Sequence, residues 1–320
     1  MPRKGQAGHN VRMNEPVAYL EGEIVPLSQA VLPVWDSGFV LGTTIIEQLR
    51  TFGGQVFHLE HHLSRLERSL ELVGVKAGLT LQEIGDIAIR LIALNRPLID
   101  RDDDLGLSIF VTPGDSPSMT EGRSGAPRVG IHTFPLSFGI WAEKYSQGQT
   151  LITTNTRHVP NECWPAEIKC RSRMNYYLAD REASARQTDA RALLLDMEGF
   201  ITEASTANLV IYREGDGLIA PPKASVLPGV SLSVLWKLAD QLDIATSERQ
   251  LLPSDVAQAD EVLLSSTPFC ILPVSQVDGI DIGQSVPGPI FGRLLAAFDR
   301  LVGLDIAAQA RRFACRKNAS

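Results

Sequence analysis

The residues best suited to chemistry lie in one stretch of the chain, from Glu167 to Gly229. Lys169 stands in the run Glu-Ile-Lys-Cys-Arg-Ser-Arg-Met-Asn-Tyr-Tyr, at a predicted strand-to-helix junction. Glu203 follows in Ile-Thr-Glu-Ala-Ser-Thr-Ala-Asn-Leu, beside small polar residues. The turn 229–231, Gly-Val-Ser, opens a predicted helix, and the free N–H groups at a helix start can hold a phosphate.

An amine, a carboxylate and an anion cradle are the groups that pyridoxal phosphate requires from a protein. They form a Schiff base with its aldehyde, pair with its pyridine nitrogen and seat its phosphate. Lys169 follows Ile168 and precedes Arg171 and Arg173, so desolvation and nearby positive charge are expected to lower its pKa and leave a neutral amine available. The alternatives are an exposed lysine at a helix start, or Lys144 in a predicted linker.

Hydrophobic periodicity predicts a small first domain over residues 15–134, after a flexible tail at 1–14. A hairpin is expected around Glu21-Gly22, a turn and strand over 36–50, and a second hairpin at Gly53-Gly54. Leucines spaced three and four residues apart predict a helix over 58–70, and a capping box at Thr80 begins another that ends near 94. Two further strands are expected at 107–112 and 129–134.

An aperiodic segment at 135–147 predicts a linker to a larger second domain, 148–306. Strands are expected at 150–156, 191–196, 206–212, 217–220, 260–267 and 271–277, with the second and third of these joined through Glu198-Gly199. Helices are expected at 230–242 and 290–302. The remaining residues, 307–320, are predicted to be a C-terminal tail.

Composition excludes several classes of protein. A chain of 320 residues with a net charge of −7 and a pI near 5.4 fits two globular domains and argues against a nucleic-acid partner. No run approaches the roughly 18 apolar residues that span a membrane, and residues 1–6 lack an apolar signal core, so we expect a soluble, cytoplasmic protein. The four cysteines show no CxxC spacing, so neither a metal site nor a disulfide framework is expected.

Over roughly residues 15 to 300 the chain resembles the fold-type IV pyridoxal-phosphate enzymes. This group contains branched-chain aminotransferase, D-amino-acid aminotransferase and aminodeoxychorismate lyase. The motifs that carry the resemblance occur in the family's order, namely Asp36-x-Gly38-x3-Gly42-x4-Glu47, His62-x-x-Arg65-Leu66, the Lys169 segment and Thr202-Glu203-x4-Asn208. The resemblance implies a two-domain α/β (α+β) fold, with a small N-terminal α/β domain and a larger C-terminal domain built on a β-barrel-like sheet.

The resemblance also implies roles that spacing alone does not give. From spacing, His62 and Arg65 only share one solvated helix face. In the resembled family this arginine reaches the cofactor phosphate, and the resemblance implies that His62 orients it or packs beside it. The position of Phe39 lies near the substrate in that family. The cofactor-binding set implied by motif and resemblance is Arg65, Lys169, Tyr176, Glu203, Gly229, Val230, Ser231 and Thr267, with Lys169 as the catalytic residue and Tyr176 at the cofactor's phenolate oxygen.

One spacing departs from the resembled family. There the lysine usually stands three or four residues before the asparagine, whereas Lys169 stands six before Asn175. A strict alignment would place Arg171 or Ser172 at the lysine position, which would abolish the Schiff base. A junction longer by two or three residues keeps Lys169 in place, and we favour that interpretation.

The predicted function is that of a transferase, a pyridoxal-phosphate-dependent aminotransferase. Tyr176 favours a branched-chain-like amino acid as the donor, with a 2-oxo acid as the acceptor. The alternatives are D-amino-acid aminotransferase and aminodeoxychorismate lyase activity. An alternative of another class is a non-catalytic homologue that binds pyridoxal phosphate or another phosphorylated ligand, suggested by the lysine spacing. The resemblance implies a homodimer with sites near the interface.

Overall fold

The computed structural model describes residues 15–316, and their first half forms a six-stranded antiparallel sheet with the order β2-β1-β6-β5-β3-β4. The tail predicted at 1–14 lies outside the described residues. The strands are β1 (Val17–Leu20), β2 (Glu23–Pro26), β3 (Ile45–Phe52), β4 (Gln55–Val56), β5 (Leu105–Thr112) and β6 (Arg128–Pro135). Both predicted hairpins, β1–β2 and β3–β4, are confirmed.

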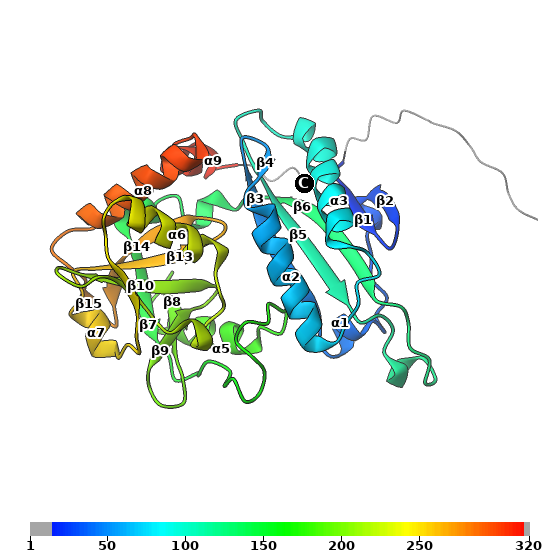
Figure 1. Ribbon diagram of the computed structural model, residues 1–320, viewed down its shortest axis with the longest axis horizontal. Helices are drawn as coiled ribbons and strands as arrows, with labels where there is room; N and C mark the ends of the chain where they lie inside the picture. Colours follow the sequence, from blue (N-terminus) through cyan, green and yellow to red (C-terminus); the bar gives the residue numbers. More distant parts are fainter. Residues whose placement is uncertain (1–14, 317–320) are drawn as a thin grey trace, which may run out of the picture.

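Two helices, α2 (Leu59–Val73) and α3 (Leu81–Asn95), cover one face of this sheet (Figure 1). The apolar stripe of α2 is buried against the strands through Leu63, Leu66 and Leu70. The capping box predicted at Thr80 is present, because the Thr80 side chain accepts from the Glu83 N–H and Glu83 accepts from the Thr80 N–H. A short helix, α1 (Ser37–Val40), replaces the simple turn expected before β3.

The second half closes into a barrel. Strand β10 pairs with both β13 and β9, so the ladder β10-β13-β14-β7-β8-β9 returns to its starting strand. Its members are β7 (Gln149–Thr153), β8 (Arg191–Leu195), β9 (Ile201–Ala204), β10 (Ala207–Arg213), β13 (Glu261–Ser266) and β14 (Cys270–Val277). The predicted fold class, a mixed α/β chain with a barrel-like second sheet, is confirmed.

Further elements surround this barrel (Figure 1). Strands β11 (Gly217–Ala220), β12 (Thr246–Glu248) and β15 (Ile280–Asp281) extend the sheet. The helices of this half are α4 (Lys144–Gln147), α5 (Met174–Arg186), α6 (Val230–Gln241), α7 (Pro253–Ala257), α8 (Pro289–Val302) and α9 (Ile306–Phe313). Among residues 15–316, no helix is both long enough and apolar enough to cross a membrane.

The prediction of a C-terminal tail at 307–320 is wrong for residues 307–313. Residues 306–313 form helix α9, in which Ala307 and Ala310 are buried. The Gln309 amide accepts from Arg50 at 2.9 Å and donates to Asp104 at 2.8 Å, and both partners belong to the first half of the chain. Alanines and a buried glutamine provide few large apolar side chains, so the sequence did not predict this helix. Residues 317–320 lie outside the described part of the chain.

Two other expectations change in detail. Strand β9 was missed, since the segment after Glu198-Gly199 was expected to run directly into the next strand. The segment 135–147 contains α4, and its buried Phe138, Trp141 and Tyr145 pack in the core of the second half. The division into domains at 15–134 and 148–306 stays a prediction.

Candidate active site

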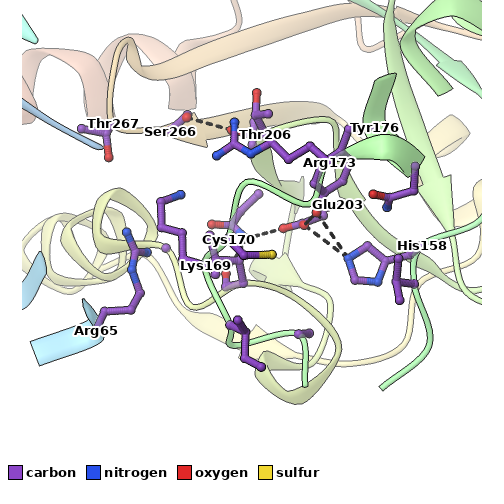
Figure 2. Close-up of a pocket in the computed structure, with 18 of the residues that line it drawn as sticks. Arg65, His158, Lys169, Cys170, Arg173, Tyr176, Glu203, Thr206, Ser266 and Thr267 are labelled. Atoms are coloured by element: carbon purple, nitrogen blue, oxygen red, sulfur yellow. Dashed lines mark hydrogen bonds and ion pairs between the residues drawn. The ribbon is translucent and has the colours of Figure 1, made fainter. Parts of the chain in front are cut away.

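A cavity lies where α2 of the first half meets the barrel, and its empty space, counted to the open mouth, is about 800 Å³. All eight residues predicted to bind the cofactor line it, namely Arg65, Lys169, Tyr176, Glu203, Gly229, Val230, Ser231 and Thr267. Phe39 does not line this cavity; it lies on α1 and is 74% exposed. In Figure 2, Lys169 stands between Arg65 on one side and Glu203 on the other.

The backbone around Lys169 is held by the first half of the chain. The Lys169 carbonyl accepts from the Ile46 N–H at 3.0 Å, and the Arg171 N–H donates to the Thr44 carbonyl at 2.8 Å. The Lys169 N–H donates to the buried Ser69 hydroxyl of α2 at 3.2 Å. A strand was expected immediately before Lys169, but the structure has none there. Lys169 lies in an irregular segment that is fixed from outside by β3 and α2.

The Ser69 contact can be tested by mutation. We expect Ser69→Ala to leave the Lys169 N–H without a partner and to lower the free energy of unfolding by about 1–3 kcal/mol. Denaturant unfolding measures this loss. Ser64→Ala, an exposed serine on the same helix, is the matched control and should stay within about 0.5 kcal/mol of the wild type. Equal stability of the two variants would contradict the role of Ser69.

The amine of Lys169 is suited to react. Desolvation by burial, the charge of Arg65 and, more weakly, that of Arg173 lower its pKa to about 7, against the opposing effect of Glu47. Within residues 15–316 the amine makes no hydrogen bond and no ion pair, so its charged form has no direct partner. A neutral, nucleophilic amine is therefore present in a large fraction of molecules near pH 7. The sequence named burial and Arg173 as causes, but it did not foresee Arg65.

Arg65 is positioned by a carboxylate that sequence reasoning did not assign. Glu47 of β3 is completely buried, and its oxygens lie 2.7 and 2.8 Å from Nε and Nη2 of Arg65 and 2.7 Å from Nδ1 of His62. Burial alone would raise the pKa of Glu47, but Arg65 and His62 lower it to about 2. Nη1 of Arg65 donates to the Pro228 carbonyl at 2.7 Å. This leaves a second N–H of Nη1 for an anion.

Beside Arg65, directly after the Pro228 that it binds, the chain forms a cup suited to a phosphate. Gly229 precedes α6, and no side chain caps the helix start. A Cβ at this position would come within 2.0 Å of Oδ1 of Asn208, so only glycine fits. Gly229, Val230 and Ser231 line the cavity, which places the first N–H groups of α6 at its wall. Together with Arg65 and the nearby Thr267 (Figure 2), they can neutralise a dianion.

At the other end of the cavity, Glu203 is buried in a polar cluster. The Tyr176 hydroxyl donates to its Oε1, and the Asn208 amide donates to Oε2 at 3.4 Å. Nε2 of His158 lies 3.4 Å from Oε1 (Figure 2). Burial and the Glu203 charge raise the pKa of Tyr176 well above its ordinary value, so its hydroxyl keeps its proton. These neighbours fix the orientation of the Glu203 carboxylate in the cavity wall.

Sequence reasoning missed two residues of this wall. His158 is a single histidine without periodic context, and only the fold brings it to Glu203. Thr206 stands in the tight turn between β9 and β10 with a φ of 63°, a left-handed conformation uncommon for threonine, and its carbonyl accepts from Ser266 at 2.9 Å. The short Ser-Thr pair before Asn208 is the only signal that marked this turn.

Comparison with known proteins agrees with this geometry. The family model described as amino-transferase class IV matches residues 44–277, which include Arg65, Lys169 and Glu203. Because the match covers more than half of the chain, the protein belongs to the class IV aminotransferase family and is a transaminase.

Individual relatives are similar over most of their length. The branched-chain-amino-acid aminotransferase of Escherichia coli strain K12 is 28% identical over 292 residues, covering 88% of this chain and 91% of its own. The D-alanine aminotransferase of Bacillus licheniformis is 25% identical, covering 84% and 91%. A crystal structure of the E. coli branched-chain enzyme superposes with a TM-score of 0.83 at 25% identity, covering 90% of this chain and 95% of the other.

Proposed function

We propose that this transaminase uses pyridoxal phosphate and moves the amino group of a branched-chain-like amino acid to a 2-oxo acid. The observation that carries the proposal is the position of Lys169. Its amine makes no hydrogen bond within residues 15–316, has a pKa lowered to about 7, and lines a cavity that also contains the start of α6 and the buried carboxylate of Glu203. Solved structures of a related branched-chain aminotransferase contain pyridoxamine 5'-phosphate or a phosphopyridoxyl adduct, which supports the choice of cofactor.

The residues of the cavity match the three parts of pyridoxal phosphate. We propose that Arg65, Thr267 and the start of α6 bind the phosphate and that Glu203 pairs with the ring nitrogen. Because the single hydroxyl proton of Tyr176 is donated to Glu203, we propose that Tyr176 supports this carboxylate rather than donating to the phenolate oxygen, the role that the resemblance implied. The cofactor, when bound, supplies an aldehyde for amines and a ring that accepts electrons. The ion pair between Glu47 and Arg65 keeps the guanidinium in place before the phosphate arrives, which reduces the entropy cost of binding.

Lys169 handles the proton in this proposal. With the cofactor bound, Nζ would remove the proton from the Cα of the amino acid, hold it and deliver it to the carbon that carried the cofactor's aldehyde. A pKa near 7 suits both directions, because the amine is neither permanently protonated nor permanently neutral. Glu203 is held in position meanwhile by the hydroxyl of Tyr176 and the amide of Asn208, which donate to its oxygens.

The apolar wall of the cavity supports a hydrophobic donor. Val159, Trp164, Ala166 and Ile168 line it from the segment that leads to Lys169. Branched aliphatic side chains are favoured by such a surface because each buried CH₂ contributes about 0.8 kcal/mol. D-Amino acids are the second candidate, on the strength of the similarity to the D-alanine aminotransferase of Bacillus licheniformis.

The function is tested by supplying purified protein with pyridoxal phosphate, 2-oxoglutarate and one donor at a time. L-Leucine and L-valine should form glutamate faster than D-alanine does. Faster turnover of D-alanine would replace the main proposal by the second candidate. No glutamate with any donor, together with no glutamate consumption in the reverse direction, would remove the proposal.

Glu203→Gln is expected to lower kcat about tenfold to a hundredfold, because a neutral amide replaces a charge-assisted hydrogen bond to the ring nitrogen. Steady-state kinetics with the best donor measures the change. Glu198→Gln, an exposed residue of the turn between β8 and β9, is the control and should match the wild type. A Glu203→Gln enzyme with unchanged kcat would show that this carboxylate does not act on the cofactor.

We also propose a homodimer. Val31, Val34, Trp35, Phe39 and Leu41 are exposed large apolar residues in one short stretch, and such a stretch on a protein surface often marks an interface. The Ser172 hydroxyl donates to the Gly42 carbonyl, so this stretch adjoins the Lys169 segment and supports a role for Phe39 at the substrate. Sedimentation at micromolar concentration should give twice the chain mass. A cytoplasmic location stays a prediction from the sequence.

A further inference from the structure

Arg173 is a charged group in the cavity that the proposed cofactor contacts do not use. It stands immediately before α5 and is half-buried in the cavity wall. Within residues 15–316 its guanidinium makes no hydrogen bond and no ion pair. Arg65, the other arginine of the wall, is bound by Glu47 and Pro228. In the view of Figure 2 the Arg173 side chain extends from the Tyr176 side towards Thr206 and Ser266, which also line the cavity.

The half-buried guanidinium of Arg173 is available to bind an anion in the cavity. Its five donors are suited to a carboxylate or a phosphate in a forked arrangement. The cup at the start of α6 already provides for a phosphate, with Arg65 at its edge. Glu203, the one carboxylate of the wall, is surrounded by Tyr176, Asn208 and His158. None of these groups pairs with Arg173 within residues 15–316, so its guanidinium is available to an anionic group of a second molecule, the substrate.

The position of Lys169 indicates which molecule this is. The Cα of an amino acid that reacts there must lie against Nζ, and its carboxylate carbon is bonded directly to that Cα. Arg173 lines the same cavity as Lys169, and its charge contributes to the lowered pKa of Lys169. A carboxylate between these two groups would neutralise Arg173 while its carbon neighbour faces the amine.

We propose that Arg173 binds the α-carboxylate of the amino acid and of the 2-oxo acid, and so restricts this enzyme to carboxylate-bearing substrates over simple amines. This inference rests on the proposed function, because it takes Lys169 as the reacting amine. Arg173 is a specificity residue that acts by contact with the substrate. Its neighbour Arg171 points elsewhere: it donates to the Ser108 hydroxyl of β5 at 3.3 Å and does not line the cavity.

The test uses an unreactive pair of ligands. Purified protein saturated with pyridoxal phosphate is titrated with 4-methylpentanoate and with its uncharged amide, and affinities are measured by calorimetry. The wild type should bind the acid about tenfold to a hundredfold more tightly than the amide. Arg173→Gln should lose this difference, Arg173→Lys should keep part of it, and Arg171→Gln should keep all of it. In turnover, Arg173→Gln should raise KM for amino acids far more than for an amine without a carboxylate.

The outcomes separate this inference from the proposed function. A wild-type protein that binds acid and amide equally, or binds neither, overturns the inference even if it transaminates. An Arg173→Gln protein that keeps the acid preference but binds pyridoxal phosphate more weakly also overturns it, because Arg173 then serves the cofactor. A protein that shows the Arg173-dependent preference but forms no glutamate would keep the carboxylate site and lose the proposed function.

Discussion

Lys169→Met is expected to reduce kcat/KM for transamination by at least 10²–10⁴-fold, the range that a positioned acid–base group contributes. The loss should exceed that of the other variants, because this amine is proposed both to hold the cofactor and to move the substrate proton. Methionine fills a similar volume without a charge, so the cavity wall should stay packed. Steady-state kinetics with the best donor measures the effect.

Lys144→Met provides the matched control. Lys144, at the start of α4, is the other lysine that the sequence left open for this role, and it does not line the cavity. Its variant should keep wild-type activity. Near-normal turnover by Lys169→Met, or a large loss in Lys144→Met, would contradict the assignment of the catalytic lysine.

Lys169→Met is also expected to change the stability of the protein. Lys169 has a folded pKa of about 7, below the roughly 10.4 of an unfolded lysine. Between these values the unfolded chain binds more protons, so the free energy of unfolding of the wild type rises with pH in this window. Lys169→Met removes this dependence and should unfold at a higher temperature than the wild type at pH 7, both without cofactor.

Glu47→Gln is expected to lower the free energy of unfolding by about 3–5 kcal/mol at pH 7, because Arg65 loses its buried charged partner. The cofactor should also bind more weakly, since the guanidinium is no longer held at the cup. Denaturant unfolding measures the first effect, and titration with pyridoxal phosphate measures the second. Glu67→Gln, an exposed glutamate of α2, should change stability by less than about 0.5 kcal/mol.

The pH dependence of this effect has a definite sign. The pKa of Glu47 falls from its unfolded value of about 4.3 to about 2 on folding. Its stabilising contribution is therefore fully present above about pH 4.5 and is lost as the pH falls towards 2. The stability difference between wild type and Glu47→Gln should shrink between pH 5 and pH 3. A difference that stays constant over this range would contradict an ionised Glu47.

The sequence predicted the parts of the site that depend on local patterns. Leucine spacing gave α2, and with the family motif it placed Arg65 at the cavity. It did not reveal why Arg65 is fixed there, because Glu47 lies on a strand 18 residues earlier and meets it only in the fold. His158 and Glu203 likewise lie far apart in the chain and meet only when the barrel closes.

The segment around Lys169 shows the same limit. A strand before the lysine was expected from Ile168 and its neighbours, yet the backbone pairs with β3 through Thr44 and Ile46 instead. Such pairing over more than 120 residues leaves no periodic trace in the sequence. Helix α9 was missed for a related reason, since Gln309 is held by Arg50 and Asp104 from the first half of the chain.

The proposed function requires that the amine of Lys169 bind the aldehyde carbon of pyridoxal phosphate. The most direct test is to treat the protein, incubated with pyridoxal phosphate, with borohydride and to map the modified peptide by mass spectrometry. We expect one phosphopyridoxyl group per chain, attached to Lys169, and none in Lys169→Met. A protein that stays unmodified, or carries the group on another lysine, would show that Lys169 does not form this bond.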